Sequence, residues 1–130
     1  MILINRNTVN TVILTLSEKT TLTPVYYLFE VINDTTNNVK CFIADDVSVN
    51  KLRYNEFVIN ESATEDLLNG TVSLVQSGYY KYNIYEQSSS TNLDPTLATN
   101  LVDKGKLRVA ATEQTIDVYS GNQTNYVVYN

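Results

Sequence analysis

The chain has no histidine and no tryptophan, and only one of its 130 residues is cysteine. Without histidine it lacks the commonest general base and the commonest transition-metal ligand. This excludes serine, cysteine and zinc hydrolases that depend on an imidazole. The single cysteine, Cys41, excludes an intrachain disulfide, and the apolar run 39–44 around it predicts a buried, unreactive thiol. We therefore expect a protein that is not an enzyme and that holds no cofactor and no metal ion.

The carboxylates that could still carry chemistry are poorly spaced for it. Asp45 is adjacent to Asp46, and Glu65 to Asp66, so the side chains of each pair diverge. We interpret them as solvated loop residues rather than as a glycosidase pair. Asp45, Asp46 and Asp94 could offer oxygens to calcium, but the sequence has no Asp-x-Asp-x-Asp-Gly pattern. With only four glycines, the chain has no glycine-rich phosphate loop.

Charged residues are also scarce, at 18% of the chain, and the net charge is -5. An acidic domain lacks the electrostatic footprint of a nucleic-acid binder, so we expect no nucleic-acid partner. The basic residues are scattered except for Lys104, Lys106 and Arg108, which we interpret as solvated charge at a sheet edge. No segment approaches the ~20 apolar residues of a membrane span, and residues 1–6 do not suit a signal peptide. We therefore expect no membrane partner and folding in a cytoplasm.

Asparagine, threonine, serine and ten tyrosines replace the missing charge and make the composition β-rich. Apolar runs bounded by turn residues predict about seven strands. They are 2–5, 11–16, 25–32, 39–44, 54–60, 79–86, and 100–102 with a continuation at 106–110. The segment 61–76 could hold one helical turn. The expected fold class is all-β, an immunoglobulin-like antiparallel β-sandwich with a β-prone C-terminal tail.

The most informative segment is 77–87, a turn glycine followed by a strand with two different faces. Tyr80, Tyr82 and Ile84 share one face. The pattern Gly78-x-Tyr80-x-Tyr82 is typical of the start of strand F in immunoglobulin-like sandwiches, where a tyrosine hydroxyl bonds back to upstream backbone. We therefore assign Gly78, Tyr80 and Tyr82 to the tyrosine corner and the core.

The expected domain organisation is a single sandwich over 1–111, followed by a strand or tail over 112–130. The tail is polar, so its aromatic rings gain little from the core of their own domain. Tyrosine offers a large contact area at low entropic cost and is favoured at interfaces. We therefore expect the tail to be an edge strand or a partner-binding arm, with contacts from Tyr119, Tyr126, Val127 and Tyr129.

Several segments taken in order resemble small virion proteins of tailed phages that infect Bacteroidota, including the crAss-like phages. The resemblance begins with NTVILTLSEKTTLTP at 10–24 and covers residues 2–110. It continues through Tyr27-Leu28-Phe29, Arg53-Tyr54-Asn55-Glu56-Phe57, Gly78-x-Tyr80-x-Tyr82-x-Ile84-Tyr85-Glu86-Gln87, Asn92-x-Asp94-Pro95-Thr96 and Gly105-x-Leu107-x-Val109.

This resemblance implies a structural protein of the virion. The role that we favour is an auxiliary, or decoration, capsid protein bound to the major capsid protein, and the alternative is a neck, tail or fibre-base component. Its partners would be the major capsid protein or other virion proteins, with a homo-oligomer also compatible. A carbohydrate-binding adhesion module is the second class of function, because tyrosines over a polar loop could stack on host glycans.

Overall fold

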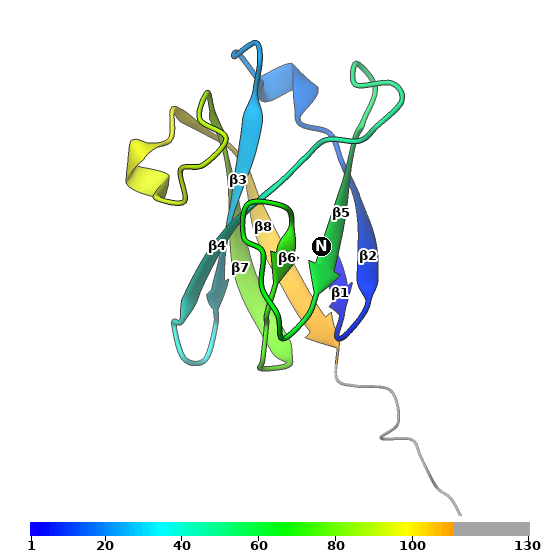
Figure 1. Ribbon diagram of the computed structural model, residues 1–130, viewed down its shortest axis with the longest axis vertical. Coiled ribbons are helices and arrows are strands. Elements are labelled where there is room, and N and C mark those ends of the chain that lie inside the picture. Colours follow the sequence, from blue (N-terminus) through cyan, green and yellow to red (C-terminus); the bar gives the residue numbers. More distant parts are fainter. Residues whose placement is uncertain (111–130) are drawn as a thin grey trace, which may run out of the picture.

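The computed structural model describes residues 1–110, which form eight strands and two short 3₁₀ helices (Figure 1). The strands are β1 (Ile2–Asn5), β2 (Val9–Leu14), β3 (Tyr26–Asn33), β4 (Val39–Ala44), β5 (Asn55–Glu61), β6 (Thr71–Val72), β7 (Gly78–Gln87) and β8 (Asn100–Ala110). The 3₁₀ helices are η1 (Ser17–Lys19) and η2 (Pro95–Leu97). No helix within 1–110 is long and apolar enough to cross a membrane.

The strands form two sheets that face each other across the core. One sheet has five strands in the order β1-β8-β7-β3-β4, and the other has three in the order β2-β5-β6. The order β8-β7-β3-β4 opposite a β2–β5 pair is that of an immunoglobulin-like sandwich, so the expected fold class is confirmed. Two pairs differ from the antiparallel expectation, because β1 runs parallel to β8 and β5 runs parallel to β6.

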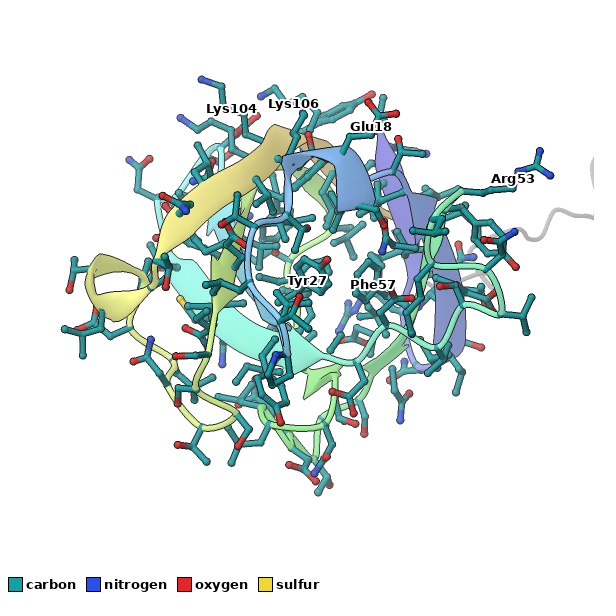
Figure 2. The ribbon with its side chains drawn as sticks, turned by 90° about the horizontal axis from the view of Figure 1, so that it is seen from above. Glu18, Tyr27, Arg53, Phe57, Lys104 and Lys106 are labelled. Atoms are coloured by element: carbon teal, nitrogen blue, oxygen red, sulfur yellow. The ribbon has the colours of Figure 1, made fainter. Side chains whose placement is uncertain are left out.

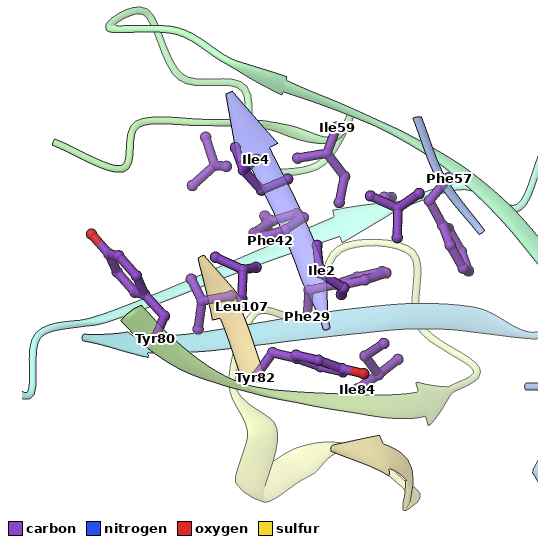
Figure 3. Close-up of a cluster of buried hydrophobic side chains, with 14 of the residues drawn as sticks. Ile2, Ile4, Phe29, Phe42, Phe57, Ile59, Tyr80, Tyr82, Ile84 and Leu107 are labelled. Carbon is purple, nitrogen blue, oxygen red and sulfur yellow. The ribbon is translucent and has the colours of Figure 1, made fainter. Parts of the chain in front are cut away.

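Alternating inward side chains fill the space between the sheets (Figures 2 and 3). Phe29 of β3 stacks on Phe42 of β4 with ring centroids 5.1 Å apart, and Phe57 of β5 meets Phe29 edge-on at 5.1 Å. All three rings are fully buried, and each contributes roughly 1.5–3 kcal/mol through burial. The strand expected at 25–32 is β3, which lies between β7 and β4.

The structure corrects some boundaries. The strand expected at 11–16 is β2 at Val9–Leu14, and the two runs expected at 100–102 and 106–110 are one strand, β8. The helical turn expected within 61–76 is wrong, because this segment contains turns and the short β6. Residues 112–130, the expected tail, lie outside the described part of the chain.

Candidate functional site

Tyr80 has the geometry of a tyrosine corner. Its side chain is 5% exposed, and its hydroxyl donates a hydrogen bond to the Gln76 carbonyl oxygen at 2.7 Å. Gly78, two residues earlier, has a φ of +120°, a conformation that a side chain would strain. The corner therefore fixes where the chain enters β7, and these residues serve the fold rather than a binding site.

Tyr82 occupies the space that a glycine leaves on the neighbouring strand. It lies opposite Gly105 of β8, and a Cβ at position 105 would come within 3.0 Å of the Tyr82 ring. The Tyr82 hydroxyl donates to a carboxylate oxygen of Asp103 at 3.2 Å. Burial, and then the Asp103 charge, raise the pKa of Tyr82 to about 12. The phenol therefore stays protonated and acts as a structural donor.

Asp46 organises the loop between β4 and β5. Its carboxylate accepts hydrogen bonds from the Ser48 hydroxyl at 2.6 Å and the Asn55 amide at 2.6 Å, and Lys51 Nζ lies 3.7 Å away. Burial raises the pKa of Asp46, but the hydrogen bonds from Ser48 and Asn55 outweigh it, so the pKa is lowered. The neighbouring Asp45 is exposed. Asp46 is thus not the freely solvated carboxylate that the sequence suggested.

The other candidate carboxylates also have local partners. Glu65 accepts from Lys40 Nζ at 2.9 Å, Asp66 accepts from the Asn69 amide at 2.8 Å, and Asp94 caps η2 through the Thr96 N–H at 2.9 Å. Within residues 1–110, no group of three or more carboxylate or cysteine side chains is placed to hold a metal ion. The structure therefore does not bring Asp45, Asp46 and Asp94 together.

Glu86 is a buried carboxylate that our sequence analysis missed. It is fully buried, and it accepts from the Thr21 N–H at 2.8 Å, the Leu22 N–H at 3.1 Å and the Asn100 amide at 2.9 Å. Burial raises the pKa of Glu86, but the hydrogen bonds from Asn100 and Thr21 together outweigh burial, so the pKa is lowered from its usual value. Glu86 therefore fixes the connection between β2 and β3 against β7 and the start of β8.

Cys41 is half-buried on β4 rather than fully buried. Burial, followed by the charge of Glu30, raises its pKa to about 11. The thiolate is therefore rare at neutral pH, which makes the thiol a poor nucleophile.

The main surface feature is a cluster of cations on the outer side of the five-stranded sheet. On β8 and β7, Lys106 lies opposite Lys81 and Arg108 lies opposite Tyr79, so all four side chains share one face. Lys104 lies on the same face, and all these side chains are exposed (Figure 2 labels Lys104 and Lys106). We call Lys81, Lys104, Lys106, Arg108 and Tyr79 the basic face.

The structure bears out the interpretation of Lys104 and Lys106 as sheet-edge charge and corrects it for Arg108. β1 pairs with 107–110 of β8, so Arg108 lies inside the sheet, whereas Lys104 and Lys106 lie where β7 is the only neighbour of β8. The pairing of β7 with β8 adds Lys81, which sequence spacing alone does not place there. Within 1–110, the face carries four of the nine lysine and arginine residues of a chain whose net charge is -5. The alternation in 104–108 shows that Lys104, Lys106 and Arg108 share one face of a strand, but only the pairing of β7 with β8 joins them to Lys81.

A second surface feature is a groove beside the connection that enters β3. It has a volume of about 510 Å³ and runs between residues 22–27 and 44–46, with Lys51 at its rim. Tyr26, Asp45 and Lys51 offer an aromatic ring and both signs of charge there. The rest of its lining is largely apolar and includes Leu22, Pro24 and Val25.

The expected contact residues Tyr119, Tyr126, Val127 and Tyr129 lie outside the described residues. The candidate surfaces within 1–110 are therefore the basic face and the groove. A scan of protein-family models, a search of curated proteins and a search of solved structures found no match to this chain.

Proposed function

We propose that this protein is a structural component of a phage virion, an auxiliary or decoration protein bound to the major capsid protein. The observation that carries the proposal is the basic face, because a positive patch complements a negative patch on a partner, and Tyr79 and Arg108 are residue types enriched in protein interfaces. The resemblance of residues 2–110 to small phage virion proteins supplies the class of partner. A neck, tail or fibre-base component is the alternative within that class.

The proposed protein works by contact. A specific interface buries roughly 800 Å² on each partner, and complementary charge raises the association rate and selects the partner. The basic face would bind an acidic area of the capsid surface, and many copies on a lattice would add avidity. The protein would be made in the cytoplasm of the host bacterium and act in the virion, without an enzymatic step. Tyr119, Tyr126, Val127 and Tyr129 would supply a further contact from the tail.

Co-sedimentation with capsids that lack the protein tests the proposal. Saturable binding at a fixed ratio to the major capsid protein is expected. Arg108→Glu should weaken this binding by about tenfold, equal to about 1.4 kcal/mol. Arg53→Glu is the matched control, because it makes the same change of charge at an exposed residue that points away from the side of Lys104 and Lys106 (Figure 2).

The capsid partner, the basic face and the tail can each be ruled out by a separate result. If the full chain never sediments with capsids, the capsid assignment is wrong and neck and tail assemblies become the next partners to test. If the two arginine variants bind equally well, the basic face is not the contact. A variant that ends at Ala111 tests the tail, and unchanged binding would remove Tyr119–Tyr129 from the interface.

The groove beside β3 favours a second candidate, binding of host glycans. Sugar rings stack on aromatic side chains, and carboxylate and ammonium groups bind their hydroxyls. A glycan array should then show selective binding that Tyr26→Ala removes and Tyr79→Ala leaves intact. Silence on the array together with capsid binding would favour decoration alone.

A further inference from the structure

One sheet edge in the described part of the chain carries none of the usual protection against pairing. β2 is the outer strand of the three-stranded sheet, at the right of the molecule in Figure 1. Its six residues, VNTVIL, include no charge, no proline and no glycine. Native edges are usually shortened, charged or covered, because unpaired backbone recruits other strands.

The other edges of residues 1–110 show this protection. β6 has only two residues and β1 has four. The end of β1 is further occupied by Asn10, whose side-chain amide exchanges hydrogen bonds with the Asn5 backbone at 2.9 and 3.1 Å. β4 carries Lys40, and its Ile43 N–H donates to the Leu67 carbonyl at 2.7 Å. β2 is the exception among these edges.

The register identifies the backbone groups that β2 leaves free. Val9 lies opposite Asn60, and Asn60 turns its N–H toward Gly70, away from β2, at 2.9 Å. The N–H and C=O groups of successive residues point to opposite sides of a strand, so those of Val9, Thr11 and Ile13 all point away from β5. Their side chains are exposed as well, with Val9 at 62% and Ile13 at 56%.

These three positions are symmetric about Thr11, with a β-branched apolar residue two positions away on each side. We infer that β2 is a homodimer interface, in which the β2 edges of two copies pair antiparallel across a two-fold axis at Thr11. Thr11 would then face Thr11 of the second copy, and Val9 would face its Ile13. The two residues of each pair would exchange N–H to C=O hydrogen bonds, and paired β-branched side chains stabilise such sheets.

The neighbouring surface adds to this contact. A groove of about 420 Å³ lies between β1 and β2, where Met1 is 80% and Leu3 is 52% exposed. Both β1 and β2 lack charged side chains, so no like charges oppose each other near the axis. Because β2 has only six residues, we expect the pairing to bury less than the standard interface of roughly 1,600 Å² and the dimer to be weak, with a dissociation constant on the order of 0.1 mM.

Cross-linking of the full chain tests the inference directly. Thr11→Cys in a Cys41→Ser background would place two thiols on the axis, where a short bis-maleimide can join them. Val49→Cys is the control, because its side chain is 93% exposed in the loop between β4 and β5 and is not part of the β2 edge. At equal protein concentration, Thr11→Cys should give at least about tenfold more cross-linked dimer, since pairing raises the effective thiol concentration.

A charge variant supplies the second measurement. Thr11→Lys would bring two ammonium groups together on the axis and should abolish dimer formation in sedimentation equilibrium at millimolar concentration. Thr15→Lys, an exposed threonine just beyond β2, should leave the dimer intact. Thermal melts of both variants check that each is folded.

Three outcomes would overturn the inference. The first is equal cross-linking of Thr11→Cys and Val49→Cys, and the second is equal dimerisation of the two lysine variants. The third is cross-linking of Thr11→Cys only in a chain that ends at Ala111, which would make residues 112–130 the strand that covers β2. None of these outcomes depends on capsid binding, so the experiment tests the dimer independently of the proposed function.

Discussion

Replacing Tyr80 by phenylalanine should destabilise the sandwich through one lost hydrogen bond. The change leaves the buried ring in place and removes the hydroxyl that donates to the Gln76 carbonyl at 2.7 Å. No other side chain or backbone atom within 1–110 donates to that carbonyl. The variant therefore isolates the contribution of the tyrosine corner from that of aromatic burial.

The expected cost follows from the surroundings of this bond. A neutral intramolecular hydrogen bond contributes about 0.5–1.5 kcal/mol net, and an acceptor left without a partner adds to the loss. Gln76 itself is exposed, so water can reach part of its backbone and limit that addition. We expect a loss of about 1–1.5 kcal/mol in the free energy of unfolding.

Urea denaturation followed by circular dichroism measures this loss. With a slope of roughly 1–3 kcal/mol per molar urea, the unfolding midpoint of Tyr80→Phe should fall by about 0.3–1.5 M without a change of slope. Tyr79→Phe is the matched control, since it removes the same atom one residue earlier from a ring that is 53% exposed. Equal midpoints for the two variants would refute the corner as a source of stability.

Three further predictions concern other side chains of the core and its border. The pKa of Glu86 is lowered in the folded state, so its contribution to stability is present above about pH 4.3 and is lost as pH falls through the folded pKa. Between about pH 6 and about pH 3, the urea midpoint of Glu86→Gln should therefore change less than that of the natural chain. Gly105→Ala should lower the melting temperature by about 3–6 °C because its Cβ meets the Tyr82 ring, and Tyr82→Leu should abolish that penalty. With its pKa raised to about 11, Cys41 should react with an aromatic disulfide reagent at pH 8 about 100-fold more slowly in the folded chain than in urea, and equal rates would contradict the assigned environment.

Much of this fold could be predicted from local patterns. The runs at 2–5 and 39–44 coincide with β1 and β4, because both are short apolar segments that are followed by turn residues. The Gly78-x-Tyr80-x-Tyr82 pattern marked both the glycine with positive φ and the ring whose hydroxyl bonds back to Gln76. Such features depend on neighbours within a few residues, which a sequence displays directly.

The remaining features depend on contacts between distant segments. The alternation along β7 puts Glu86 on the same inward face as Tyr80, but it does not reveal that Thr21 and Leu22 of a distant connection donate to the carboxylate. The basic face needs the pairing of Lys81 with Lys106, positions that are 25 residues apart in sequence. The parallel pairing of β1 with β8 likewise joins the two ends of the described chain. No local periodicity encodes these partners.

The dimer that we infer would place two basic faces on the same side of the assembly. An antiparallel pair of β2 edges continues one sheet into the next, and its two-fold axis is perpendicular to that sheet. The five-stranded sheets of both copies would then lie on one side, with Lys81, Lys104 and Arg108 of each directed outward. Two binding faces directed the same way suit a flat, repeating partner, because the second contact becomes intramolecular. If both proposals hold, Thr11→Lys should weaken capsid binding although Thr11 lies on the other sheet, whereas Thr15→Lys should not.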